Sequence, residues 1–279
     1  MGFLTGKTAI ITGAGRAVLS DGRCGSIGYG IATAYAKEGA NLVITGRNVQ
    51  KLTDAKEELE RLYGIKVLPV QADVSAGADN KAVVDNVVKQ AIDTFGRIDV
   101  LINNAQASAS GVTLADHTQE QFDLAMYSGL YAVFYYMQAC YPYLKETKGS
   151  VINFASGAGL FGNYGQCAYA AAKEGIRGLS RVAANEWGAD GINVNIICPL
   201  AWTAQLENFE KAYPDKTIAD LWSVDTFFRP ATIEFIRQKS EFTEAPTYSY
   251  QFTYEFPIDG GKAAWHCAEI PFVFHNICL

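Results

Sequence analysis

The stretch that decides the fold is residues 7–46, KTAIITGAGRAVLSDGRCGSIGYGIATAYAKEGANLVITG. Its β-branched start at residues 7–13 predicts a buried strand, and residues 26–38 predict an amphipathic helix that Gly39 ends. Residues 41–45 return to a strand pattern. A strand, a helix and a second strand in this order predict a βαβ unit, whose two strands run parallel.

The same alternation continues for about two hundred residues. A charged helix is expected at residues 49–63, with Gly64 as its stop, and further strands are expected at residues 66–71, 99–103, 150–154 and 192–197. The predicted fold class is therefore α/β, a doubly wound parallel sheet of the Rossmann type with helices on both faces.

The composition of the chain limits the classes of binding partner that it suits. The 279 residues carry 23 basic and 29 acidic side chains, a net charge of −6, which argues against nucleic acid or an anionic membrane surface as partner.

Residues 124–144 hold no charge, but Pro142 and several tyrosines favour a buried or subunit-facing helix over a membrane span. The aromatic segment 131–143 predicts a homo-oligomer. The six cysteines show no metal-ligand spacing, so we expect no metal site and a cytoplasmic, thiol-reduced protein.

A glycine-rich turn follows the first predicted strand. Gly13 ends the strand, and Ser26 and Ile27 open the helix, where unpaired N–H groups and the helix dipole favour a pyrophosphate. Residues 17–24 lengthen this turn beyond the usual size. Arg16 and Arg23, in or next to this insertion, either reach phosphate or are solvated, and the sequence leaves both interpretations open.

The second predicted strand ends in Arg47 rather than an acidic residue. A carboxylate at this point would hold a ribose 2′-hydroxyl, whereas a planar guanidinium suits a 2′-phosphate. We therefore expect NADP(H) as cofactor in preference to NAD(H). The alternative is that Arg47 is a surface residue at a strand end.

Three residues suggest proton-transfer chemistry. Tyr169 and Lys173 are four positions apart in a helical stretch, so their side chains share one face, and an ammonium there would lower the phenol pKa. Ser156 ends a predicted strand, where its hydroxyl would hold a substrate oxygen. Together they suit a secondary alcohol and ketone pair.

In this order the motifs resemble the short-chain dehydrogenase/reductase family over residues 5 to about 214. The resemblance rests on the glycine turn, Asp73, the Asn103-Asn104-Ala105 run, the Ser/Tyr/Lys set and the segment NIICP at 195–199. It implies Asp73 and Val74 near the adenine, Asn103 and Ala105 along the cofactor, and Lys173 on the nicotinamide ribose. Runs such as NNAQASASG and CAYAAAKEGIRGLSRVAANEWG further resemble NADP-using clostridial bile-acid 12α-hydroxysteroid dehydrogenases.

Three positions depart from the family pattern. Gln106 replaces a glycine after the fourth strand, Gly129 replaces a helix asparagine that supports a proton relay, and Pro199-Leu200 replaces Pro-Gly. These departures leave the reaction type unchanged but put the proton path and the substrate loop in doubt.

The C-terminal part changes character. Residues 216–279 resemble the end of type-B carboxylesterases, with His266 at the position of that family's triad base. The chain has no Gly-x-Ser-x-Gly elbow, and a base without its nucleophile performs no acyl transfer. We therefore expect a domain at 1–215 that lacks its last strand, a joint near residues 209–215, and a foreign fragment at 216–279.

The expected function is hydride transfer between NADP(H) and a small secondary alcohol or ketone, a bile acid or other steroid. Two alternatives stay open. The run SIGYGIA at 26–32 resembles enoyl-thioester reductases, although their tyrosine and lysine are more widely spaced. The foreign tail also fits a non-catalytic, cofactor-binding remnant.

Overall fold

The computed structural model describes residues 2–75, 77–199, 207 and 211. The chain divides into two compact units, Met1–Ala204 and Gln205–Leu279. In the second unit the described residues are Glu207 and Lys211, which form an ion pair with 3.5 Å between Oε2 and Nζ. All that follows concerns the first unit.

Six parallel strands form one sheet in the order β3-β2-β1-β4-β5-β6. Their bounds are β1 Thr8–Thr12, β2 Asn41–Gly46, β3 Val67–Gln71, β4 Val100–Asn103, β5 Ser150–Phe154 and β6 Asn193–Ile197. The chain starts in the middle of the sheet, builds outward through β2 and β3, and then returns to the other side of β1 with β4. This order confirms the predicted doubly wound fold, because the strand sequence reverses direction between β1 and β4.

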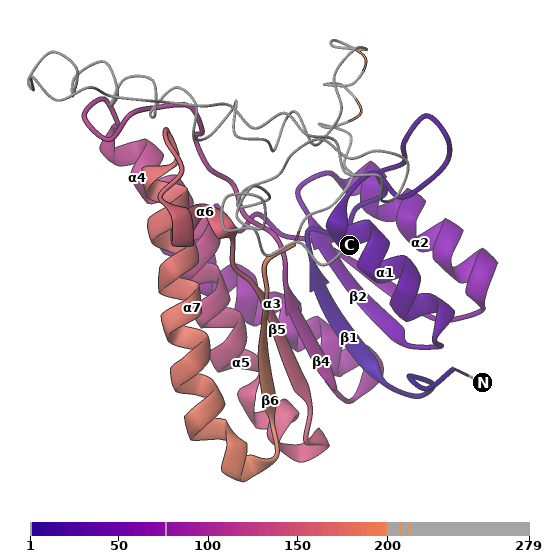
Figure 1. Ribbon diagram of the computed structural model, residues 1–279. Coiled ribbons are helices and arrows are strands. Elements are labelled where there is room, and N and C mark those ends of the chain that lie inside the picture. Colours follow the sequence, from indigo (N-terminus) through magenta and orange to yellow (C-terminus); the bar gives the residue numbers. More distant parts are fainter. Residues whose placement is uncertain (1, 76, 200–206, 208–210, 212–279) are drawn as a thin grey trace, which may run out of the picture. The chain divides into compact units, whose positions relative to one another are not determined.

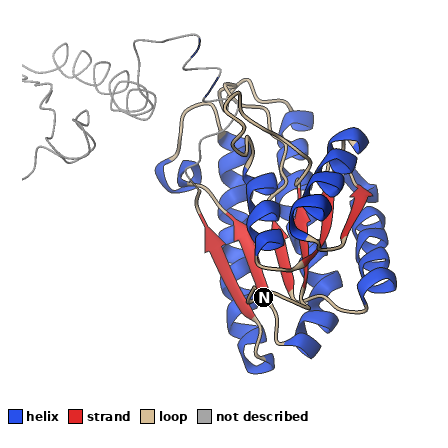
Figure 2. Ribbon diagram, turned by 90° about the vertical axis from the view of Figure 1, so that its right-hand side faces the viewer, coloured by secondary structure: helices blue, strands red, loops and turns tan. Residues whose placement is uncertain are grey.

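Helices cover both faces of the sheet, as Figures 1 and 2 show. One face packs on α1 and α2, through buried side chains such as Tyr29 and Leu59. The opposite face packs on α3, α5 and α7, through side chains such as Val87 and Tyr136. The helix bounds are α1 Ile27–Lys37, α2 Val49–Tyr63, α3 Asn80–Phe95, α4 Gln119–Ala125, α5 Ala132–Thr147, α6 Gly157–Phe161 and α7 Cys167–Trp187, with short 3-10 helices at Gly77–Asp79 and Gly188–Asp190.

The ends of α2 show why its predicted bounds are correct. Asn48 caps the first turn, its side-chain oxygen accepting from the Lys51 N–H at 2.9 Å. Gly64 ends the helix in the left-handed conformation at φ 67°, which a residue without a side chain adopts at little cost.

The uncharged stretch around residues 124–144 is a helix with an irregular turn. A π-helix, Met126–Tyr131, joins α4 to α5. Here the Ser128 hydroxyl contacts the carbonyls of Leu124 and Ala107, at 2.6 and 2.8 Å. No helix within the described residues is long and apolar enough to cross a membrane.

Strand β6 is the edge of the sheet within the described part of the chain. It pairs on one side with β5, from Ser150–Asn193 to Phe154–Ile197, and its side chains are more exposed than those of β5. Leu200, the tail 216–279 and His266 lie outside the described residues, as does the predicted joint near residues 209–215 apart from Lys211.

Candidate active site

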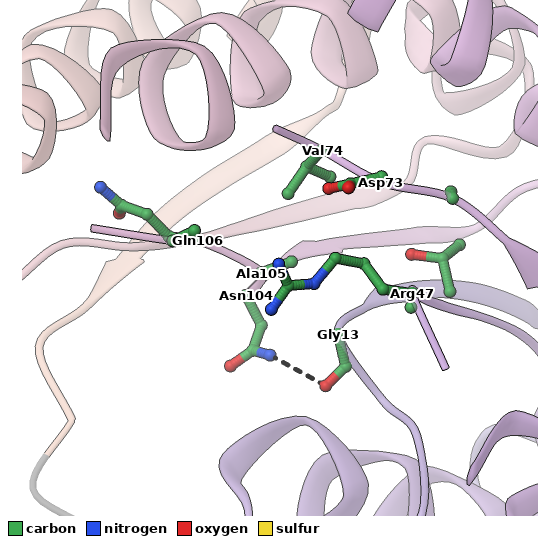
Figure 3. A pocket seen from close by; sticks show the side chains of 11 residues that line it. Gly13, Arg47, Asp73, Val74, Asn104, Ala105 and Gln106 are labelled. Atoms are coloured by element: carbon green, nitrogen blue, oxygen red, sulfur yellow. Dashed lines mark hydrogen bonds between the residues drawn. The ribbon is translucent and has the colours of Figure 1, made fainter. Parts of the chain in front are cut away.

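A pocket opens at the carboxyl ends of the central strands, where the strand order reverses. Figure 3 shows its lining, which comes from the end of β2 and from the loops after β1, β2, β3 and β4. The lining residues are Gly13, Thr45, Gly46, Arg47, Ala72, Asp73, Val74, Asn104, Ala105, Gln106 and Ala107. In open α/β sheets this crevice is the usual place of a bound dinucleotide.

Five residues that the sequence predicted to bind the cofactor meet in this pocket: Gly13, Arg47, Asp73, Val74 and Ala105. They come from four separate loops, so the fold brings together positions that lie up to ninety-two residues apart in the chain (105 minus 13). Their convergence is the first structural support for one shared ligand site.

The other predicted cofactor residues have different surroundings. Asn103 is buried, and its side-chain nitrogen donates to the Asn153 oxygen at 2.8 Å, so in this structure it belongs to the interior beneath the pocket. Ser26 caps α1, its hydroxyl accepting from the Tyr29 N–H at 3.4 Å, and Ile27 is the first residue of that helix. The helix N-terminus that the sequence predicted therefore forms. It lies next to Gly13, but Ser26 and Ile27 do not line the pocket.

The insertion at residues 17–24 is a small hairpin. Val18 and Cys24 form an antiparallel bridge, and the Gly25 N–H donates to the Ala17 carbonyl at 2.7 Å. The base of the hairpin is thus closed by a backbone hydrogen bond, so the two glycine clusters stay adjacent despite the added residues.

The two arginines of this loop are both paired with carboxylates. The Arg16 Nε atom lies 2.6 Å from the Glu58 Oε2 atom on α2, and the Tyr29 hydroxyl donates to the other Glu58 oxygen at 2.6 Å. The exposed Arg23 pairs with Asp21 at the hairpin tip. The sequence did not reveal Glu58 as a partner, because Arg16 and Glu58 are 42 residues apart.

The start of α1 lies very close to the turn after β1. A Cβ atom added to Gly28 would lie 2.8 Å from the carbonyl carbon of Gly13 and closer still to its oxygen. Asn104 supports the same turn, its side-chain nitrogen donating to the Thr12 carbonyl at 2.9 Å and approaching the Gly13 carbonyl at 3.5 Å, the contact dashed in Figure 3. A glycine is therefore required at position 28, because the backbone of α1 packs directly against the backbone of Gly13.

Ser156, Tyr169 and Lys173 lie at the carboxyl end of β5 and on α7. Ser156 follows β5 and caps α6, with its hydroxyl oxygen accepting from the Ala158 N–H at 3.1 Å. Tyr169 and Lys173 are one turn apart on α7, and the Lys173 nitrogen lies 5.4 Å from the centroid of the Tyr169 ring. The buried Lys173 ammonium donates to the Phe154 carbonyl at 2.6 Å.

The pKa values in this cluster follow burial. Desolvation raises the pKa of Tyr169, and a hydrogen bond with Ser156 acts in the lowering direction without cancelling it. Burial lowers the pKa of Lys173 to about 8. In this structure burial therefore outweighs any lowering of the Tyr169 pKa by Lys173, and the role expected of Lys173 stays a prediction.

Two departures from the family pattern occupy the same space. A Cβ atom at Gly129 would lie 2.6 Å from the Gln106 side-chain nitrogen and 2.8 Å from its Cδ atom. The Gln106 carboxamide therefore fills the volume that a side chain at position 129 would take. Its nitrogen approaches the Ala125 carbonyl at 3.4 Å, while its buried oxygen has no hydrogen-bond partner within the described chain.

The family model described as short chain dehydrogenase matches residues 7–213. The chain belongs to the short-chain dehydrogenase family and is an oxidoreductase.

Individual proteins agree with this assignment. The chain is 70% identical over 215 residues to a 12alpha-hydroxysteroid dehydrogenase of Clostridium sp., covering 77% of this chain and 80% of that relative. It is 34% identical over 194 residues to a 3-oxoacyl-acyl-carrier-protein reductase of Staphylococcus epidermidis, covering 69% and 74% of the two chains. A metagenomic short-chain oxidoreductase solved in complex with NADP has a TM-score of 0.63 and 29% identity, covering 71% of this chain and 84% of that structure.

Proposed function

We propose that this chain is an NADP(H)-dependent dehydrogenase of hydroxysteroids, acting on the 12α-hydroxyl of bile acids. The observation that carries the proposal is the 70% identity to the clostridial 12alpha-hydroxysteroid dehydrogenase over 215 residues, a stretch long enough to hold the whole Ser/Tyr/Lys cluster. Identity at this level over most of both chains supports a shared substrate class more strongly than the fold alone does.

The proposed catalytic roles follow from the geometry of the cluster. Tyr169 donates and accepts the proton of the substrate oxygen, and Ser156 orients that oxygen. Because the Ser156 oxygen already accepts from the Ala158 N–H, its own proton remains available for donation to the substrate. Lys173 supplies positive charge beside the phenol and a donor for the nicotinamide ribose. The bound nicotinamide supplies the hydride chemistry.

The pocket fits a dinucleotide carrying a 2′-phosphate. Gly13 and Gly28 allow the turn after β1 to pack closely against Ala105 and the start of α1, and the N-terminus of α1 favours a pyrophosphate. Arg47 supports the choice of NADP(H), since it lines the pocket and no carboxylate of the described residues lies within ion-pair distance of it. Asp73, Val74 and Ala105 would line the rest of the cofactor site, with Asn103 holding its floor.

Fluorescence titration tests this cofactor choice. We expect NADPH to bind more tightly than NADH by roughly 1–3 kcal/mol, the contribution of one charge-assisted phosphate contact. Arg47→Gln should remove this preference, whereas Arg61→Gln, which removes an exposed cation from the far end of α2, should keep it. Equal affinities for the two cofactors in the unchanged protein would contradict the role given to Arg47.

Turnover assays separate the proposed function from its alternatives. NADP⁺ with cholate or deoxycholate should give a 12-keto product, and a bile acid without a 12-hydroxyl should give none. Reduction of an enoyl thioester instead would favour the enoyl-reductase alternative. Cofactor binding without turnover of either substrate would favour the non-catalytic remnant.

We also propose that residues 1–215 and 216–279 come from two unrelated genes. The family match ends at residue 213, close to the proposed joint near residues 209–215, and the match to the clostridial relative covers 77% of this chain. Limited proteolysis tests this division. A stable fragment that ends near residue 215 supports it, whereas a tail as resistant as the rest of the chain contradicts it.

We expect a homo-oligomer that uses the aromatic face of α5 and the π-helix. Tyr131 and Phe134 are both exposed, and Tyr127, Tyr131 and Tyr135 form a ladder with ring centroids 5.1 and 6.1 Å apart. Aromatic side chains of this kind are enriched in subunit interfaces. Light scattering should show an assembly, and Phe134→Asp should weaken it.

We place the protein in the cytoplasm. The four cysteines of the described residues, Cys24, Cys140, Cys167 and Cys198, are free thiols. Free thiols are typical of a reducing compartment. Fractionation of the source cells tests this placement.

A further inference from the structure

The carboxyl end of β5 is held by two cations from α7. The Lys173 nitrogen donates to the carbonyl of Phe154 at 2.6 Å, and the Arg177 Nη2 atom donates to the carbonyl of Ser156 at 3.2 Å. Lys173 and Arg177 are four residues apart, so they lie one above the other on the same face of α7 as Tyr169. The carbonyl groups before and after Ala155 are therefore both held by side chains from one face of α7.

The guanidinium of Arg177 is itself held in place. Its Nε atom lies 3.1 Å from each carboxylate oxygen of Glu174, and Nη2 also lies 3.5 Å from the sulfur of Cys198, just after β6. The Arg177 side chain is only 11% exposed. A planar group with fixed donors can join three elements in this way, whereas an ammonium would act as a point charge.

These contacts bear on the hydroxyl of Ser156. The residue has an extended backbone, at φ −152° and ψ 150°, and its side chain caps α6. The direction of its carbonyl sets the peptide plane between Ser156 and Gly157, the start of α6, and the next peptide unit carries the Ala158 N–H that holds the hydroxyl oxygen. Without Arg177, the carbonyl would lose its one side-chain donor among the described residues, and only the first turn of α6 would hold the plane.

We propose that Arg177 is a positioning residue, which acts through the backbone of Ser156 to aim its hydroxyl at the substrate oxygen. This inference rests on the proposed function of the same cluster. Arg177 touches neither the phenol of Tyr169 nor the pocket lining, so its effect falls on the chemical step rather than on cofactor binding.

The test compares four variants of the full-length chain. Arg177→Met removes all donors, Arg177→Lys keeps the positive charge and a compact donor group, and Glu174→Gln keeps the arginine but weakens its anchor. Arg181→Met is the matched control, since Arg181 is exposed one turn further along α7. For each variant we would measure kcat with a 12α-hydroxy bile acid, the Kd of NADPH by fluorescence, and the midpoint of urea unfolding.

We expect Arg177→Met to lower kcat by about 10- to 100-fold, the loss that a misplacement near 1 Å produces in an active site. The Kd of NADPH should change by less than about twofold. The midpoint of urea unfolding should change little. Arg177→Lys should restore part of kcat, Glu174→Gln should show a smaller loss than Arg177→Met, and Arg181→Met should match the unchanged protein.

Several results would overturn the proposal: an Arg177→Met variant with full kcat, an equal loss in Arg181→Met, or a loss of cofactor affinity parallel to the loss of kcat. If Arg177→Met fails to fold, the proposal is judged by Arg177→Lys and Glu174→Gln, and full kcat in both would reject it. If the unchanged protein turns over no bile acid, the proposed function fails separately. Crystal structures would then decide, and a Ser156 Oγ to Ala158 N distance that stays at 3.1 Å in Arg177→Met would reject the positioning role.

Discussion

Replacing Gly28 by alanine should damage the cofactor site through a backbone clash. The new Cβ atom would lie 2.8 Å from the Gly13 carbonyl carbon and 2.8 Å from the Asn104 side-chain nitrogen. Non-bonded carbon atoms sit comfortably at 3.5–4.0 Å, so the turn and the helix must separate by at least about 0.7 Å. Rotating the Asn104 side chain cannot relieve this clash, because the carbonyl carbon and oxygen of Gly13 are backbone atoms.

The neighbouring Gly30 offers a matched comparison. It lies on the same helix, and a Cβ atom there would meet the Cys24 Cβ atom at 3.7 Å, an ordinary contact. Both substitutions gain the same helix propensity, roughly 1 kcal/mol for alanine over glycine. The difference in unfolding free energy between Gly28→Ala and Gly30→Ala therefore isolates the clash, which we expect to be about 1–3 kcal/mol.

Two measurements check this prediction. Urea unfolding gives the stability of each variant, and NADPH fluorescence gives its cofactor affinity. Gly30→Ala should be as stable as the unchanged protein or more so, and should bind NADPH normally. Gly28→Ala should be the less stable variant and should lose at least about tenfold in affinity, because the turn moves away from the helix N-terminus. Two variants of equal stability and affinity would refute the close approach seen here.

Three further predictions concern the catalytic cluster and the Gln106–Gly129 pair. Tyr169→Phe should lower the chemical step by several orders of magnitude with little change in NADPH affinity, and a fully active variant would remove Tyr169 from the mechanism. Because burial lowers the Lys173 pKa from its ordinary value to about 8, the unfolded chain binds more protons at this residue, so its contribution to stability should rise by about 2 kcal/mol between pH 7.5 and 9.5. Urea unfolding at both pH values should show this rise in the unchanged protein and not in Lys173→Met. Gly129→Ala should cost about 1–2 kcal/mol by displacing the Gln106 carboxamide, and the cost should vanish in a Gln106→Gly background if a double-mutant cycle is measured.

Local patterns in the sequence sufficed for the fold. The bounds of α2 and β5 match the predicted 49–63 and 150–154, because a capping residue, a terminal glycine and a β-branched run are all signals within a few positions. Of the five pocket residues, Gly13 and Arg47 were predicted from the residues at the strand ends, and Asp73, Val74 and Ala105 were implied by the family resemblance.

Contacts between distant residues were not predictable in this way. The pairing of Arg16 with Glu58 depends on how α2 packs against the glycine turn, so the sequence left open whether Arg16 reaches phosphate. The net direction of the Tyr169 pKa shift was not predictable either, because it depends on burial that no four-residue spacing reveals. Gln106 and Gly129 were recognised as two separate departures from the family pattern. Only the fold shows that the Gln106 side chain fills the space that a side chain at position 129 would take.

The closed hairpin at residues 17–24 makes the glycine turn tolerant of changes in length. Its two ends are joined by the hydrogen bond from Gly25 to Ala17, so the distance across the base does not depend on how many residues the tip contains. The entropy of closing a loop grows only with the logarithm of its length, about 0.6 kcal/mol for each doubling. The tip at Ser20–Gly22 is therefore a position at which a peptide tag should be tolerated without a change in the spacing of the two glycine clusters.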